Sequence, residues 1–482
     1  MWLEWSADAF ARAAATHKPV LLSLVTAWSD ECAAMDATTY SRPEVESLVG
    51  DRFIAVRVDA DRRPDINERY NLGGWPTTAF LTSEGETLSG ATFLDPPQMI
   101  AALQQVADAY RDRTDEISAR SARLRAHREA PRAPRDSTSD PLSAIAHFRR
   151  LLAARFDAPN GGFGAAPKLP HPHALAFALS LGADGDSELE GMAAATLHRM
   201  RALWDAGSGG FFRYADASDW SRPGTGKTLE DNARCLHVYV DAALRLRNVE
   251  WLEQAAALVR WVKESMADEA KGGFFNAQSA HAVDTTMYVD KNAMMVGAFI
   301  RAAALFDDVW LRDFALKSLE AVIVPAYTPG RGMAHLIGEG GHHEVRGLLT
   351  DQIHVADALI WAHAATGQLP YSMLAAELVH FSMRTMWDDE SGRFRDRVTD
   401  EDPAFPFALN CEAACVLDRL GVLTGDIAYR ERGRAILQSL APEYHQQDIF
   451  GAPYVLAVRE IFDRRPPPGL ELSPVDWQLG RT

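Results

Sequence analysis

The sequence predicts a multidomain protein in which a small N-terminal α/β domain precedes an all-α toroid of six helical hairpins, an (α/α)6 barrel. Three observations indicate this. Strand-forming runs are confined to residues 18–93, helical patterns fill the remainder, and a polar residue opens an apolar helix about every 60 residues. Such a fixed period is typical of one supersecondary unit repeated along the chain. We expect domains at 1–112 and 140–482, joined by a linker at 113–139.

Composition excludes several classes of protein. The chain is 47% hydrophobic and 24% charged, and it has neither an apolar run that could span a bilayer nor the features of a signal peptide. A formal net charge of −17 argues against nucleic-acid binding. Four cysteines are too few for a disulfide framework and carry no zinc-binding spacing. We therefore expect a cytoplasmic protein with no membrane or nucleic-acid partner, no metal and no cofactor.

The N-terminal domain shows the order β-α-β-β-β-α after one additional helix. Strands are indicated by β-rich runs, and the last helix by an aspartate cap followed by two prolines in the first turn. The predicted elements are helix 6–16, strand 18–25, helix 30–49, strand 53–59, strands 77–81 and 87–93, and a helix from 98.

Two short motifs in this domain resemble the thioredoxin fold. Trp28-Ser29-Asp30-Glu31-Cys32 lies at a strand-to-helix turn, and Gly74-Trp75-Pro76-Thr77 precedes a strand. The resemblance implies a site made of Trp28, Ser29, Cys32 and a cis Pro76. In thioredoxins the first cysteine of Cys-x-x-Cys is the nucleophile. Ser29 holds that position here, so two-cysteine exchange is excluded, and we interpret Cys32 as a buried structural residue.

A longer run narrows this resemblance. Residues 58–76, with Arg63-Pro64-Asp65-Ile66 and Gly73-Gly74-Trp75-Pro76, are similar to the VDREERPDID…GGWP run of the DsbH-like thioredoxin-domain family (DUF255), which includes spermatogenesis-associated protein 20. The family's CHWCHVM segment aligns with residues 29–35, where the first cysteine and both histidines are missing. Further similar segments, at 160–170, 209–214 and 227–233, extend the resemblance over nearly the whole chain.

The resemblance also bears on the second domain. In the family, the barrel is similar to six-hairpin glycosidases and sugar 2-epimerases, which implies a cleft suited to a carbohydrate. Lys227, Asp231 and Asn232 match the family's PHFEKMLYDNA segment. The family's histidine, phenylalanine, glutamate and tyrosine are replaced there by Gly224, Thr225, Gly226 and Glu230, so barrel chemistry of the family does not transfer directly.

The predicted linker, residues 113–139, is rich in arginine and alanine and ends in a proline- and serine-containing segment. We interpret its first part as a solvated extension of the preceding helix. The alternative is that its arginines contact the acidic remainder of the chain or bind phosphate.

Twelve helices are predicted in the second domain, with turns that combine glycines and an aromatic residue between them. The helices lie near 141–155, 172–182, 187–204, 231–246, 250–267, 291–306, 309–322, 351–366, 371–387, 408–420, 426–440 and 451–463. The turns lie at 156–163, 204–211, 268–274 and 387–394. An open α-solenoid is the alternative, but its repeats are shorter.

In a toroid, the polar residues that open the inner helices would converge on one central opening. Glycoside hydrolysis needs two carboxyl groups, about 5–5.5 Å or about 6.5–9.5 Å apart, and Asp231, Asp290 and Asp351 are the candidate catalytic residues. Aspartate and asparagine at helix starts are also ordinary N-caps. The candidate ligand-binding residues are Lys168, His171, Arg213, Tyr214, Trp220, Lys227, Glu230, Asn232, Asn292, His354 and Glu412. Sugar epimerisation instead needs bases such as histidine, and His171, His173, His335, His342, His343 and His354 are available.

The leading hypothesis is that the barrel binds or modifies a small, sugar-like ligand, acting as a glycosidase or an epimerase if it is an enzyme. The thioredoxin-like domain would then be a structural unit or a docking site for a protein partner. Two alternatives stay open: thiol-redox or chaperone work through Cys32, and a non-enzymatic scaffold.

Overall fold

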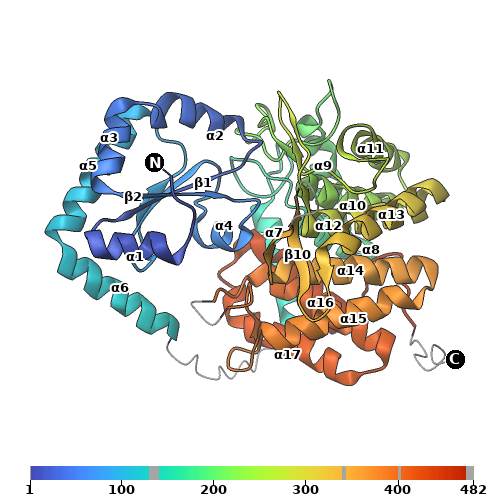
Figure 1. The fold of residues 1–482 in the computed structure, drawn as a ribbon. Coiled ribbons are helices and arrows are strands. Elements are labelled where there is room, and N and C mark those ends of the chain that lie inside the picture. The colour runs from blue at the N-terminus through green and yellow to red at the C-terminus, as the bar shows by residue number, and fades with distance from the viewer. Residues whose placement is uncertain (1, 130–139, 339–342, 400–402, 474–482) are drawn as a thin grey trace. The chain divides into compact units, whose positions relative to one another are not determined.

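The computed structural model describes residues 2–129, 140–338, 343–399 and 403–473. The chain divides into two compact units, Met1–Ala133 and Pro134–Thr482, and each is described by itself (Figure 1). Within the described ranges, no helix combines the length and the apolar character needed to cross a membrane.

The first unit is built on a four-stranded sheet with strand order β2-β1-β3-β4. Strand β1 pairs parallel with β2 and antiparallel with β3, and β3 pairs antiparallel with β4. The strands are β1 Val20–Val25, β2 Ile54–Asp59, β3 Thr77–Leu81 and β4 Thr87–Ala91, and the helices are α1 Ala7–Thr16, α2 Asp30–Met35, α3 Pro43–Arg52, α4 Pro64–Tyr70, α5 Pro96–Asp112 and α6 Thr114–Glu129.

Helices cover both faces of this sheet, which explains the continuous apolar run of β1. Successive side chains of a strand point to opposite faces. Leu22 accordingly packs in one core with Ala9 of α1 and Ile66 of α4, whereas Leu21 packs in the other with Leu103 of α5. The sheet is therefore the middle layer of a three-layer unit (Figure 1).

Three details of this unit differ from the prediction. The helix predicted over 30–49 is interrupted: α2 continues as a π-helix, Asp36–Tyr40, and α3 begins anew at Pro43. Arg42 is extended because a residue before proline is disfavoured in the α region. Helix α4 was not predicted, and α6 occupies part of the predicted linker, whose residues 130–139 lie outside the described ranges.

The second unit is a closed ring of helical hairpins. Each inner helix contacts the next, and the last, α18, contacts the first, α8. The inner helices are α8 Pro172–Ala183, α10 Leu229–Leu246, α12 Val289–Phe306, α14 Leu349–Thr366, α16 Phe407–Thr424 and α18 Ala452–Ile461. The outer helices are α7 Ser143–Arg155, α9 Ser187–Met200, α11 Val249–Trp261, α13 Val309–Ala326, α15 Leu369–Thr385 and α17 Ile427–Tyr444. Ring closure confirms the toroid and excludes an open solenoid.

Short strands lie in the loops between the ring helices, although no strand was predicted beyond residue 93. Most have only two residues, too few to show a period-two pattern. They are β5 Lys227–Thr228, β6 Ala277–Gln278, β7 Val283–Asp284, β8 Met287–Tyr288, β9 Tyr327–Thr328, β10 Gly332–Ile337, β11 His343–Arg346, β12 Trp387–Asp388 and β13 Arg393–Phe394.

A buried amide fastens each of four loops to the start of an inner helix. The Asn232 side chain accepts a hydrogen bond from the backbone N–H of Phe211 (2.8 Å) and donates to the carbonyls of Phe211 (3.0 Å) and Thr228 (2.9 Å). The same arrangement recurs at three further amides; the four amide clamps are Asn232, Asn292, Gln352 and Asn410.

The clamps, about 60 residues apart, set the repeat noticed in the sequence. The sequence prediction placed the repeated polar residue at Asp231, Asp290, Asp351 and Asn410. The last of these is itself an amide clamp, and each of the other three lies one or two residues before one.

Candidate functional site

A central cavity of about 260 Å³ is lined by residues from all six inner helices and by the segment 465–468. Helix α10 contributes Arg234, His237, Asp241 and Arg245. Residues three and four apart lie on one face of a helix, so this spacing turns all four side chains toward the ring centre. The equivalent face of α16 contributes Glu412, and that of α14 contributes His354 and Asp357.

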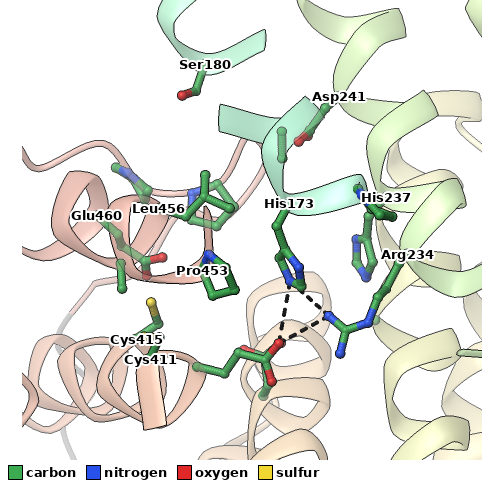
Figure 2. Close-up of a pocket in the computed structure, with 18 of the residues that line it drawn as sticks. His173, Ser180, Arg234, His237, Asp241, Cys411, Cys415, Pro453, Leu456 and Glu460 are labelled. Atoms are coloured by element: carbon green, nitrogen blue, oxygen red, sulfur yellow. Dashed lines mark hydrogen bonds and ion pairs between the residues drawn. The ribbon is translucent and has the colours of Figure 1, made fainter. Parts of the chain in front are cut away.

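Four of these side chains form a connected group, the His-Arg-Glu cluster: His173, Arg234, His354 and Glu412. Arg234 Nη1 lies 2.9 Å from His173 Nε2 and donates to Glu412 Oε1 at 3.1 Å. His354 Nε2 lies 2.9 Å from the other oxygen, Glu412 Oε2. Figure 2 shows His173 and Arg234 pointing toward one another across the cavity. Helices α8, α10 and α14 thus each place one side chain around the carboxylate that α16 contributes.

The two histidines of the cluster have opposite protonation tendencies. Burial is the largest influence on His173 and lowers its pKa, and the charge of Arg234 acts in the same direction. Because a guanidinium group only donates hydrogen bonds, His173 Nε2 accepts from Arg234 and therefore carries the lone pair of the neutral ring. The ring proton then lies on Nδ1. Burial also opposes protonation of His354, but the hydrogen bond and charge of Glu412 outweigh it and raise the pKa.

Glu412 stays ionised between these partners. Burial would raise the pKa of its carboxyl group, but the charge of Arg234 and the hydrogen bond and charge of His354 hold it well below the usual range. In its protonated form, which the raised pKa favours, His354 donates from Nε2 to Glu412 and from Nδ1 to the Thr350 carbonyl at 2.8 Å. The cluster therefore combines a carboxylate with one histidine whose protonated form is favoured and one whose neutral form is favoured.

A buried chain of polar groups continues from His354. The Thr350 hydroxyl lies 3.0 Å from His354 Nδ1 and donates to Asp290 Oδ2 at 3.0 Å. His335 Nδ1 lies 3.9 Å from Asp290 Oδ1 and 2.8 Å from Asp351 Oδ1. Burial raises the pKa of Asp351 to about 6, although His335 opposes the shift. The His-Arg-Glu cluster is thus coupled to carboxylates outside the cavity.

Asp290, His335 and Asp351 also form a group that could hold a metal ion. Each offers one ligand atom, and these atoms lie within 4.8 Å of one another. Imidazole and carboxylate donors suit several divalent cations. Among the described residues, Asp351 Oδ2 has no hydrogen-bond partner, which fits such a ligand role. No metal site was expected from the sequence at these residues.

The other end of the cavity holds further ion pairs. Arg301 pairs with Asp241 and lies 2.8 Å from His237 Nδ1. Burial, followed by the charge of Arg301, lowers the pKa of His237 well below its usual value, so this imidazole is neutral. Arg419 pairs with Asp357 and donates to Glu460 at 2.6 Å and 2.8 Å. Each of these carboxylates is therefore an ion-pair partner of an arginine.

The three predicted catalytic aspartates do not line the cavity. Asp231 lies at the start of α10 and accepts from Arg213 Nε at 2.8 Å. Asp290 and Asp351 belong to the buried chain described above. Because each lies one or two residues before an amide clamp, its side chain points toward the loops rather than the ring centre. The structure therefore places none of the three on the lining of the central cavity, and their catalytic role stays a prediction.

Five of the predicted ligand-binding residues are buried anchors of loops. Lys168 Nζ donates to Asp157 (2.8 Å) and Lys227 Nζ to Asp205 (2.9 Å), each within a glycine-aromatic turn. Trp220 is 1% exposed and donates to the carbonyl of a residue in the first of these turns. Asn232 and Asn292 are amide clamps. A buried, fully engaged polar group stabilises the fold, so we assign these five a structural role.

The remaining predictions divide in two. Glu412 and His354 lie in the His-Arg-Glu cluster, and Glu230 accepts from Arg234 Nε at 3.3 Å beside it. His171 packs against Phe450 and is the N-cap of α8; burial lowers its pKa to about 4. Arg213 pairs with Asp231 as described, and Tyr214 is half-buried near Gly224. His342 lies outside the described residues, as does the side chain of His343.

Sequence reasoning missed Arg234, His237, Arg301 and Thr350. A signal for the first was present: Arg234, His354 and Glu412 each follow an amide clamp by two residues. Two residues advance a helix by about 200°, so a residue at that position faces away from the clamped loop and toward the ring centre. Aligning the repeat on the amides would have identified three members of the cluster.

In the first unit, Ser29 acts as the N-cap of α2. Its hydroxyl accepts from the Cys32 N–H at 3.2 Å and donates to Glu31 at 3.1 Å. Cys32 is 4% exposed, and burial raises the pKa of its thiol. The Trp75–Pro76 peptide bond is cis, as the resemblance implied. The Trp28 indole donates to Asp61 at 2.7 Å.

Comparison with solved structures places the second unit among (α/α)6 barrels. A D-mannose isomerase superposes with a TM-score of 0.56 at 14% identity, covering 64% of this chain and 88% of that one. A cellobiose 2-epimerase from Bacillus thermoamylovorans gives 0.54 at 11% identity, covering 63% and 87%. A GH76 α-mannanase from Bacteroides thetaiotaomicron gives 0.54 at 10% identity, covering 68% and 97%. At these identities the likeness shows the fold alone.

Sequence comparison is more specific. Residues 1–128 match the family model described as Thioredox_DsbH, protein of unknown function, DUF255. Spermatogenesis-associated protein 20 of Homo sapiens is 27% identical over 307 residues, 58% of this chain, and that of Mus musculus is 27% identical over 305 residues. In both cases the match spans only 38% of the relative's length. The family resemblance seen in the sequence is thereby confirmed.

Proposed function

We propose that the central cavity binds a sugar-like ligand and moves a proton on the carbon next to its carbonyl group, as in aldose–ketose isomerisation or epimerisation. A volume of about 260 Å³ lies just below the usual range of ligand pockets, about 300–1,000 Å³, and so favours a ligand near monosaccharide size. The isomerase and epimerase folds noted above are consistent with this class of ligand.

One observation carries the proposal: a neutral imidazole, His173, and an imidazolium, His354, both contact the Arg234–Glu412 pair. Proton transfer next to a carbonyl needs a base and an acid within reach of the same ligand. A ligand oxygen that takes over the hydrogen bond from Arg234 would release the lone pair of His173 Nε2. His173 would then remove the carbon-bound proton, while Arg234 stabilises the resulting oxyanion and His354 donates a proton to it.

Glycoside hydrolysis is less well supported. It needs one carboxyl group that is protonated at working pH, whereas the pKa of Glu412 is held well below its usual range. The other carboxylates of the cavity, Asp241, Asp357 and Glu460, are paired with arginines.

Exchange of the C2 hydrogen tests the proposal. The protein is incubated in D2O with a panel of aldoses, and deuterium at C2 is measured by NMR. We expect incorporation with the unmodified protein and a loss of about 10²- to 10⁴-fold in His173→Gln and His354→Gln. His198→Gln, which changes an exposed histidine outside the cavity, should exchange normally. Absence of exchange with every sugar, or equal exchange in all variants, would contradict the proposal.

We further propose that residues 1–112 form a thioredoxin-like domain that serves as a structural or docking unit, joined through 113–139 to the barrel at 140–482. The sheet order β2-β1-β3-β4, helices on both faces and the cis Pro76 support the thioredoxin-like assignment. Ser29 in place of a cysteine and the burial of Cys32 argue against redox work. The reactivity of the four thiols toward iodoacetamide tests this proposal.

A further inference from the structure

The cavity carries more positive than negative charge, in a protein whose formal net charge is −17. Six arginines and four carboxylates line it. The arginines are Arg234, Arg245, Arg301, Arg419, Arg459 and Arg465, and the carboxylates are Asp241, Asp357, Glu412 and Glu460. The positive cavity is therefore a local feature and not a consequence of overall composition.

All but one of these arginines are paired. Arg234, Arg301 and Arg419 bind carboxylates of the cavity, as described above. Arg459 and Arg465 share Asp184 at the end of α8. Within the described parts of the chain, Arg245 makes no ion pair, and its Nε is buried without a hydrogen-bond partner. A cation left without a partner in a partly buried site is costly unless a ligand compensates it.

Charged groups of both signs surround Arg245. It lies on the cavity face of α10, one turn beyond Asp241, whose carboxylate is engaged by Arg301. Burial lowers the pKa of Arg245; the charges of Asp241 and Asp184 oppose this, whereas those of Arg459 and Arg301 act in the same direction as burial. Three guanidinium groups thus crowd one end of the cavity. An anion bound there would relieve their repulsion and accept hydrogen bonds from more than one of them.

This end is separate from the His-Arg-Glu cluster. Arg245 follows Arg234 by eleven residues, which corresponds to about 16 Å along a helix at about 1.5 Å per residue. Figure 2 shows Ser180 and Asp241 lying toward the end of the cavity away from the Arg234 guanidinium. A ligand that reaches both ends would place its reacting carbon at the cluster and a charged group near Arg245.

We propose that Arg245 and its neighbours Arg301 and Arg459 form a binding site for an anionic group, a phosphate, sulfate or carboxylate, so that the ligand of the cavity is an acidic or phosphorylated sugar. The identification of the ligand as a sugar rests on the proposed function, whereas the anion site itself does not.

Titration with simple anions tests the site directly. Inorganic phosphate, sulfate and acetate are titrated into the full-length protein at constant ionic strength, and binding is measured by calorimetry. We expect at least one of them to bind, and Arg245→Gln to weaken it roughly 10- to 100-fold, as the loss of a charged hydrogen bond implies. Arg247→Gln is the matched control: it removes the same charge from an exposed residue at the end of the same helix. A preference for phosphate and sulfate over acetate would identify a tetrahedral anion, and the reverse a carboxylate.

Equal weakening in Arg245→Gln and Arg247→Gln, or no binding of any anion, would overturn the site. Glucose 6-phosphate, glucuronate and glucose then extend the test to ligands. The charged sugar that matches the preferred anion should bind at least 10-fold more tightly than glucose. This preference over glucose should be present only in proteins that retain Arg245. His354→Gln should leave anion binding unchanged. Normal anion binding without C2 exchange would refute the proposed reaction alone, and C2 exchange that is indifferent to Arg245 and to ligand charge would refute the anion site alone.

Discussion

Glu412 raises the pKa of the neighbouring His354. It accepts from Arg234 at 3.1 Å and lies 2.9 Å from His354 Nε2. The raised pKa of His354 means that this histidine stabilises the fold fully below its unfolded pKa, and that the contribution is lost as pH rises through the folded value. The lowered pKa of Glu412 works in the opposite direction, because its contribution is lost only as pH falls through the folded value. The pair is therefore most stabilising between the two unfolded values, about 4.5 to about 6.5.

Replacing Glu412 by glutamine should reverse the shift of His354. Without the carboxylate, burial becomes the dominant influence, and we expect the pKa of His354 to fall below 6.5. Titration of the imidazole by NMR measures this directly. Glu230→Gln is the control, since Glu230 is half-exposed and contacts Arg234 rather than His354. If the pKa of His354 were unchanged in Glu412→Gln, the assignment of an imidazolium to this position would be wrong.

At the scale of the element, the amide clamps explain why the helices begin where they do. Each clamp binds both backbone groups of the buried residue that follows a turn, and so fixes a loop and a helix start together. Gly210 shows how closely the turn is packed: its φ is +80°, and a Cβ would lie 2.6 Å from the Trp261 ring. Only glycine accommodates both conditions.

The substitution Asn232→Ala should destabilise the barrel by about 2–4 kcal/mol, because it leaves the buried N–H and carbonyl of Phe211 without partners. Asn248→Ala, which removes only the N-cap of α11, should cost about 1 kcal/mol. Urea unfolding of both variants measures the difference. Equal losses would mean that Asn232 is an ordinary cap and that the repeat has no structural role beyond it.

Element order was largely predictable from the sequence, whereas the site was predictable only in part. Helical periodicity located the twelve ring helices because each buries an apolar face of its own. Side-chain direction was not predictable: Lys168 precedes the first inner helix and Asp351 lies in the first turn of α14, and neither lines the cavity. His354 and Glu412 lie near the polar helix starts that the repeat marks, whereas Arg245 lies near the other end of its helix, outside that pattern. Among the residues that the structure describes, Arg245 makes no ion pair because other arginines occupy the nearby carboxylates, and no local sequence pattern indicates this.

At the scale of the whole molecule, closure of the ring joins distant parts of the sequence. Tyr444 of α17 donates to the Ala144 carbonyl of α7 at 3.2 Å and lies 2.8 Å from His147 Nδ1. Arg155 donates to Asp448 at 2.6 Å across the same junction. A closed ring leaves no exposed end repeat, and it encloses the cavity on which six helices converge. The charge of that cavity, opposite in sign to that of the molecule, follows from side chains drawn from most of these helices.

The reactivity of the four thiols tests whether the protein does redox work. Cys32, Cys235 and Cys411 are buried, Cys415 is partly buried, and burial raises the pKa of all four. A free cysteine of pKa about 8.5 is about 10% thiolate at pH 7.5, so these thiols should react with iodoacetamide at least 10-fold more slowly than an exposed one. Intact-mass spectrometry counts the labelled thiols in the native protein, and Ser41→Cys supplies an exposed reference on the first unit. Urea-unfolded protein should take up four labels. Labelling of Cys32 as rapid as that of the introduced cysteine would restore the redox interpretation of the N-terminal unit, since attack on a disulfide requires an accessible thiolate.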